Sequence, residues 1–106
     1  MVWVTGHCLY STHPLIHSFT HLKPMWQETD NKLTRSFTFK DFREAFVFMS
    51  EVAELAETLD HHPNWCNRYN VVDIALTTHS AGNTITEKDR ELAAEIDRVA
   101  KEQFNQ

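Results

Sequence analysis

The alternation of hydrophobic and polar residues changes period along the chain, and after residue 25 it predicts both strands and helices. Apolar and polar residues alternate in the segment that carries Leu33, Phe37 and Phe39 on one face, which is typical of a half-buried strand. The Asp-Asn pair at 30–31 is good turn chemistry. We therefore expect a hairpin made of this strand and a preceding strand around residues 25–28.

A long helix is predicted to follow, beginning at Asp41. Aspartate is a favoured N-cap, and Glu44 three residues later can complete a capping box. The helical region is expected to end at His62-Pro63, because the residue before a proline disfavours α geometry. Apolar residues recur at three- and four-residue spacing and predict one buried stripe. Its members are Phe42, Ala45, Phe46, Met49, Val52, Ala53, Ala56 and Leu59.

Three further apolar residues of this helix, Val47, Phe48 and Leu55, fall outside the main stripe. They make the apolar arc wide. A wide arc indicates either a second surface, such as a subunit contact, or simple overlap with the edge of the core. The pattern leaves both interpretations open.

The second half of the chain repeats the order of elements. A short strand is expected near 65–67, a clearer strand over Val71 to His79, and a loop over 80–84. Thr86 with Asp89 three residues later is an N-cap signature for a terminal amphipathic helix. The order ββαββα predicts an α+β two-layer sandwich, in which helices cover one face of an antiparallel four-stranded sheet.

Length and composition are those of one ordinary soluble domain. The chain has 106 residues, of which 42% are hydrophobic and 24% charged. No apolar run approaches the roughly 18 residues needed to cross a bilayer, so we expect no membrane contact. The formal net charge of −5 opposes direct nucleic-acid binding, which needs concentrated Lys and Arg. Two distant cysteines, Cys8 and Cys66, do not suggest a disulfide framework, and the expected setting is the reduced cytoplasm.

The chain changes character near residue 26. All fifteen acidic residues lie at Glu28 or later, whereas four of the seven histidines lie before residue 22. We interpret residues 1–25 as an N-terminal arm with one short helix over Leu15 to Leu22, and residues 26–106 as the folded domain. A histidine metal tag in the arm is the weaker alternative, since no carboxylate or thiolate stands beside those histidines.

Three histidines lie at the ends of predicted elements, where functional sites often form. His61 and His62 follow the first helix, and His79 ends the last strand. Imidazole exchanges protons near neutral pH, so one ring can protonate a leaving hydroxyl while another removes a proton. Glu57, one helical turn before His61, can orient an imidazole. A zinc site made of the three histidines and Cys66 is a weaker alternative, because no known zinc-motif spacing supports it. A nucleophilic Cys66 is weaker still, because its neighbour Trp65 suggests packing and nothing nearby would activate the thiol.

These residues form a motif that resembles the pterin-4a-carbinolamine dehydratase family. The motif runs Glu57-Thr-Leu-Asp-His61-His62-Pro63, then Tyr69, His79 and Asp89, and the resemblance covers roughly residues 26–100. The segments 37–42 and 77–82 are similar as well. One departure is a loop after His79 that is one residue longer than in common members, with Asn83-Thr84 near a position where a second glycine often stands.

The resemblance implies a ββαββα fold and dehydration of 4a-hydroxytetrahydrobiopterin to quinonoid dihydrobiopterin, which recycles tetrahydrobiopterin for an aromatic amino acid hydroxylase. It implies a homodimer or homotetramer, and neither a metal nor a bound organic cofactor, since the pterin is the substrate. By position, His61, His62 and His79 would be catalytic, with His61 and His79 moving protons and His62 mainly holding the pterin. Two residues would orient them: Glu57 and Asp89. Six would border the substrate: Asp60, Pro63, Trp65, Thr77, Thr78 and Ser80.

Two other functions remain open at this stage. The first is an interaction protein, such as a transcriptional coactivator-like dimerisation cofactor, which would dock through the wide apolar arc of the first helix. The second is a pterin binder in molybdenum-cofactor metabolism, which would bind pterin with slow or absent turnover.

Overall fold

The computed structural model describes residues 25–106, so the predicted short helix and all but the last residue of the arm predicted over residues 1–25 lie outside the described residues. Six regular elements and one 3₁₀ turn follow one another along the described chain. They are β1 (Gln27–Thr29), β2 (Lys32–Thr38), α1 (Phe42–Leu59), β3 (Asn64–Arg68), β4 (Val71–Leu76), the 3₁₀ turn (His79–Ala81) and α2 (Glu87–Phe104). No helix in this range is long and apolar enough to cross a membrane.

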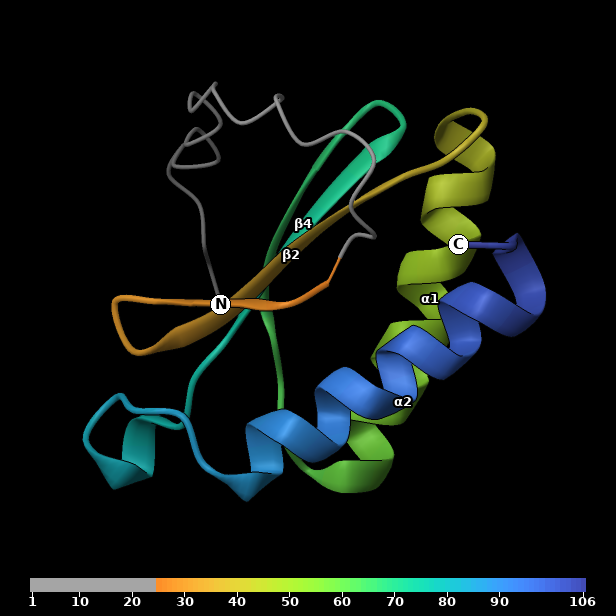
Figure 1. Cartoon of the computed structure of the whole chain (residues 1–106). Coiled ribbons are helices and arrows are strands. Elements are labelled where there is room, and N and C mark those ends of the chain that lie inside the picture. Colours follow the sequence, from red (N-terminus) through yellow and green to blue (C-terminus); the bar gives the residue numbers. More distant parts are fainter. Residues whose placement is uncertain (1–24) are drawn as a thin grey trace.

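The strands form one antiparallel sheet in the order β1-β2-β4-β3. Both helices lie together on one side of the strands (Figure 1). This arrangement confirms the predicted ββαββα sandwich. The central pair, β2 and β4, is in register so that Leu33 faces Leu76 and Phe37 faces Val72. These four side chains therefore share the face that is covered by the helices.

The core lies between that face and the two helices. Phe37 and Phe48 are almost completely buried, and their ring centroids are 4.9 Å apart. Phe104, near the end of α2, meets Phe48 edge-on at 5.8 Å between centroids. One aromatic cluster thus joins β2 to both helices, and burial of such rings supplies much of the free energy that holds the two layers together.

The buried face of α1 differs in phase from the predicted stripe. Phe48, which the pattern placed outside the stripe, is fully buried, while Phe42 and Phe46, which it placed inside, are 48% and 57% exposed. Val47 is also exposed, whereas Leu55 packs against the core. When apolar residues cover so wide an arc, sequence spacing alone does not fix which side of the helix faces the sheet.

Strand β4 is shorter than predicted, ending at Leu76 rather than His79. Thr78 instead pairs with Thr84 in an isolated bridge, and its N–H donates to the Thr84 carbonyl at 3.0 Å. Gly82 and Asn83, both with positive φ, fold the chain back between these two residues. This turn redirects the backbone away from the sheet and places His79 at the start of the 3₁₀ turn.

A charged contact joins the sheet to α2. The Arg35 side chain is only 9% exposed, and its Nη1 donates to Asp97 Oδ1 at 2.7 Å. The same carboxylate oxygen accepts a hydrogen bond from Trp26 Nε1 at 2.8 Å. The Arg35 guanidinium also lies 4.3 Å from the centroid of the Phe37 ring. Within residues 25–106 its Nε has no hydrogen-bond partner. Asp97 is the one carboxylate in this range that forms an ion pair with Arg35, so it supplies the counter-charge of the guanidinium.

We expect Asp97→Ala to lower the free energy of unfolding by about 1–3 kcal/mol, because it leaves a buried guanidinium without its counter-charge. Urea unfolding of the parent and the variant measures the difference. The matched control is Glu95→Ala on the same helix, which removes an exposed ion pair with Arg98 and should leave stability nearly unchanged. Equal losses for the two variants would contradict this account of Arg35.

Candidate active site

A pocket of about 270 Å³ opens where the end of α1, the end of β4 and the first turn of α2 meet. Each of the three regions contributes to its walls. The lining residues are Asp60, His61, His62, Thr77, Thr78, His79, Ser80 and Lys88. All three histidines singled out in the sequence therefore border one cavity, although His61 and His62 follow α1 and His79 follows β4.

The way in which α1 ends separates the two adjacent histidines. Asp60 adopts the left-handed conformation with φ 55°, which Asp tolerates better than most side chains. The next backbone N–H, that of His61, returns to the Ala56 carbonyl at 3.0 Å, as in common C-terminal helix caps. The helix thus ends before the predicted His62-Pro63 boundary. As a result the His61 ring is buried, while the His62 side chain is 58% exposed.

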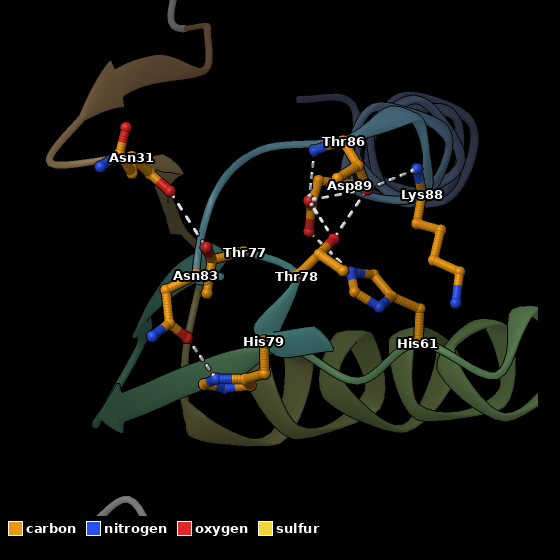
Figure 2. Close-up of polar contacts among 9 residues, drawn as sticks. All are labelled: Asn31, His61, Thr77, Thr78, His79, Asn83, Thr86, Lys88 and Asp89. Carbon is orange, nitrogen blue, oxygen red and sulfur yellow. Dashed lines mark hydrogen bonds and ion pairs between the residues drawn. The ribbon is translucent and has the colours of Figure 1, made fainter. Parts of the chain in front are cut away.

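The buried carboxylate of Asp89 fixes His61. His61 Nε2 and Asp89 Oδ1 lie 2.6 Å apart, and the Thr78 hydroxyl donates to Asp89 Oδ2 at 2.7 Å (Figure 2). The Thr86 backbone N–H donates to Oδ2 at 2.8 Å, which completes the predicted capping box of α2. Asp89 is fully buried. Burial alone would raise the pKa of Asp89, but the hydrogen bonds from Thr78, His61 and Thr86 outweigh it and hold the pKa below its ordinary value.

His62 has a weaker anchor. Its Nε2 lies 2.8 Å from Glu57 Oε2, and both side chains are largely exposed, at 58% and 75%. Glu57 was expected one turn below His61. It contacts His62 instead, because the left-handed residue at position 60 turns His61 inward. Solvent screens an exposed pair of this kind, so Glu57 constrains His62 much less than Asp89 constrains His61.

His79 is held by the loop that follows it. Its Nδ1 lies 2.6 Å from the side-chain oxygen of Asn83 (Figure 2). Asn83 has φ 60°, a left-handed conformation that Asn adopts more readily than most residues. The residue near the position where a second glycine often stands therefore supplies both the backbone turn and an acceptor for His79.

Each imidazole has one anchored nitrogen and one that makes no hydrogen bond within residues 25–106. Oxygen acceptors hold a proton on Nε2 of His61, on Nε2 of His62 and on Nδ1 of His79. The other ring nitrogen, which is Nδ1 in His61 and His62 and Nε2 in His79, can accept or donate a proton. The arrangement can therefore perform general acid and general base chemistry on one bound molecule.

Two predicted binding residues lie elsewhere. Pro63 and Trp65 do not line the pocket, and Trp65 packs against the hydrophobic core. Lys88, which lines the pocket, and Asn83, which contacts His79, were not predicted from the sequence. Their signals were weak: Lys88 stands two residues after the Thr86 N-cap, and Asn83 stands four residues after His79. Among residues 25–106, no group of three or more His, Cys, Asp or Glu is placed to hold a metal ion, so the zinc alternative gains no support.

The lowered pKa of Asp89 predicts a pH dependence of stability. Between the ordinary carboxyl pKa of about 3.9 and the lower folded value, the unfolded chain binds more protons, so stability falls as pH falls. The contribution of Asp89 is complete above this window. We expect the difference in unfolding free energy between the parent and Asp89→Asn to shrink as pH falls through it, measured by urea unfolding at several pH values. A difference that stays constant down to the lowest pH would contradict the assignment.

Comparison with known proteins agrees with the motif. The family model described as pterin 4 alpha carbinolamine dehydratase matches residues 11–99. A Synechococcus sp. (strain WH7803) protein named "Putative pterin-4-alpha-carbinolamine dehydratase" is 53% identical over 76 residues, which cover 72% of this chain and 81% of the relative. A Bradyrhizobium sp. (strain BTAi1 / ATCC BAA-1182) protein of the same name is 52% identical over 77 residues, covering 71% of this chain and 77% of the relative.

Two solved structures share the fold. A transcriptional coactivator/pterin dehydratase from Brucella melitensis is 51% identical, with a TM-score of 0.68, and the match covers 71% of this chain and 81% of that one. A pterin dehydratase-like protein described as a RuBisCO assembly factor in the alpha-carboxysome is 27% identical, with a TM-score of 0.59, covering 76% and 92%. The sequence match and the shared fold lead to one conclusion: the chain belongs to the pterin 4 alpha carbinolamine dehydratase family.

Proposed function

We propose that this protein is a hydro-lyase that converts 4a-hydroxytetrahydrobiopterin to quinonoid dihydrobiopterin and water. It would act in the cytoplasm and recycle tetrahydrobiopterin for an aromatic amino acid hydroxylase. The observation that carries the proposal is the convergence of His61, His62 and His79 on one pocket, each with a ring nitrogen available to a ligand. Family membership supports the choice of a pterin as the ligand.

The reaction needs one acid and one base. The bond between the hydroxyl oxygen and its ring carbon breaks, and the oxygen takes a proton from an imidazolium to leave as water. A neutral imidazole removes the proton from the adjacent ring nitrogen, whose electrons form the new carbon–nitrogen double bond. We assign these two steps to Nδ1 of His61 and Nε2 of His79, and solvent returns the proton between turnovers. No metal or organic cofactor is required, because the electron-rich pterin ring stabilises the cation that the hydroxide leaves behind.

The other lining residues divide into wall and binding groups. The Thr77 hydroxyl donates to the Asn31 carbonyl at 3.0 Å and the Thr78 hydroxyl to Asp89 at 2.7 Å, so both shape the wall rather than bind substrate. The side chains of Asp60 and Ser80 make no hydrogen bond within residues 25–106. A free carboxylate accepts paired N–H groups well, and Asp60 would thus bind the amino-pyrimidine edge of a pterin while His62 holds the ring.

We expect His61→Gln and His79→Gln each to lower kcat for breakdown of 4a-hydroxytetrahydrobiopterin by about 10²- to 10⁴-fold, the usual contribution of a positioned acid or base. The absorbance change on loss of the carbinolamine measures the rate, and the spontaneous reaction is subtracted. Glu57→Gln is the matched control, because its exposed contact to His62 should be worth less than about threefold. If both histidine variants turned over at the parent rate, the proposed roles would be wrong. Tight pterin binding by a parent protein without turnover would favour a pterin binder.

A protein-interaction role is the second candidate, and the exposed side of α1 favours it. Phe42, Phe46 and Val47 are 48%, 57% and 45% exposed, and the two phenylalanine rings lie 6.0 Å apart. Exposed apolar residues that cluster on one helix often mark a contact surface. We propose that this surface joins copies of the chain into a homodimer or homotetramer, and a coactivator-like role would use the same residues.

We expect Phe46→Glu to shift the protein to a smaller oligomer, because a charge in an apolar contact is costly to desolvate. Light scattering after size-exclusion chromatography measures the mass. Glu54→Ala, on an exposed part of the same helix, should leave the mass unchanged. If the parent protein is already monomeric, the proposed subunit contact is wrong, and a different protein becomes the candidate partner of this surface.

A further inference from the structure

The three imidazoles of the pocket differ in the charge of the group that anchors them. The Nε2 atoms of the two histidines after α1 lie 2.6 Å and 2.8 Å from carboxylate oxygens of Asp89 and Glu57. Nδ1 of His79 lies 2.6 Å from the side-chain oxygen of Asn83, which belongs to an uncharged amide. Among residues 25–106, His79 is thus the one imidazole of the pocket that has no carboxylate partner.

The charge of an acceptor influences which form of an imidazole is favoured. A carboxylate gives an imidazolium a counter-charge, whereas an amide oxygen accepts a hydrogen bond from Nδ1–H without adding charge. The other titratable groups on the pocket lining are Asp60, His61, His62 and Lys88. Within residues 25–106 none of them forms an ion pair or a hydrogen bond with His79, so Asn83 is the side chain that directs the proton of this ring to one nitrogen.

The turn that carries both side chains holds them at a fixed distance. The Asn83 N–H donates to the Thr78 carbonyl at 3.0 Å, and the Gly82 N–H donates to the His79 carbonyl at 3.0 Å. Asn83 has φ 60°, a left-handed conformation that glycine and asparagine adopt most readily. A glycine at this position could make the same turn, but it has no side chain to accept a hydrogen bond. The asparagine therefore adds an acceptor for His79 that the turn itself does not need.

We propose that Asn83 is a positioning residue that keeps the proton of His79 on Nδ1, so that His79 is the base of the dehydration and His61 is the acid. This inference rests on the proposed function, because it assigns a direction to its two proton transfers. Nε2 of His79 takes the proton from the pterin ring nitrogen, and Nδ1 of His61 gives a proton to the leaving oxygen. The Asp89 carboxylate supplies the counter-charge that the imidazolium of His61 needs. Solvent then removes the proton from His79 and returns one to His61.

Nitrogen-15 NMR of the imidazoles tests the tautomer without any substrate. Couplings between ring protons and ring nitrogens show which nitrogen carries the proton, and the signals of His79 are those that disappear in His79→Gln. We expect the Nδ1–H form in the parent and a mixture with the Nε2–H form in Asn83→Gly, which keeps the turn but removes the acceptor. An unchanged tautomer in Asn83→Gly would overturn the proposal.

Asn105→Gly is the matched control. Asn105 is also left-handed, with φ 59° at the end of α2, and it does not line the pocket. The same change at this position should leave the tautomer of His79 and the rate of dehydration as they are in the parent. A loss of the Nδ1–H form in this control as well would show that the effect does not come from the acceptor at position 83.

The pH dependence of kcat tests the direction of proton transfer. A base must be neutral to act, so the rising limb at low pH reports the base. Asn83→Asp places a carboxylate beside Nδ1 of His79, which favours the imidazolium, and should move the rising limb to higher pH. Asn83→Gly should lower kcat by about twofold to tenfold, the contribution of one hydrogen bond, while KM stays within about twofold.

The outcomes separate this inference from the proposed function. If Asn83→Asp moves the falling limb at high pH and leaves the rising limb in place, His79 is the acid and the direction proposed here is wrong. If Asn83→Gly keeps the parent kcat, the role of Asn83 is wrong. The proposed function stands in both cases, because the parent still dehydrates its substrate. If the parent does not turn over the carbinolamine, the proposed function fails and this inference fails with it.

Discussion

The buried carboxylate of Asp89 holds together the three segments that form the pocket. It lies on the first turn of α2, accepts a hydrogen bond from Thr78 after β4, and contacts His61 after α1. A buried carboxylate is stable only when its oxygens are well hydrogen-bonded, and here the partners come from separate parts of the chain. The contacts that satisfy the hydrogen-bonding capacity of the Asp89 carboxylate are therefore the same contacts that bring the pocket segments together.

The contacts of the three histidines differ in burial. His61 is buried with a buried partner, His79 is exposed with a partner in its own loop, and His62 is exposed with an exposed partner. The proposed reaction pairs the buried ring of His61 with the exposed ring of His79, and the exposed His62 holds the substrate. The buried ring keeps a fixed position in the wall, whereas the exposed rings can adjust to a substrate that enters from solvent.

Much of the fold could be predicted from the sequence, because strand and helix periods are local properties. The alternation around Phe37 and the N-caps at Asp41 and Thr86 placed strands and helices close to their observed bounds. The rotation of α1 could not be predicted. Its apolar arc is so wide that either Phe46 or Phe48 could face the core, and only packing against the sheet decides.

Most residues of the site could be predicted from the sequence, but which side chains contact one another could be predicted less well. The spacing of His61, His62 and His79 identified residues that do line one pocket. Glu57 was paired with His61 but contacts His62. The left-handed conformation of Asp60 ends the helical geometry, so His61 no longer lies one turn above Glu57 on the same face of the helix. Lys88 was not predicted because a lysine in the first turn of a helix is ordinary in sequence. Its place on the pocket lining depends on how α2 packs beside the ends of α1 and β4.

Because Asp89 caps α2 as well as contacting His61, its retention in a related sequence would say little about whether that relative is an enzyme. A descendant that lost catalysis but kept its shape would still need a carboxylate there to start the second helix. The side-chain contact between His79 and Asn83 joins no helix or strand to another, since both side chains are exposed within one turn. In a relative with a purely structural role, we therefore expect His79 and Asn83 to be replaced before the buried Asp89.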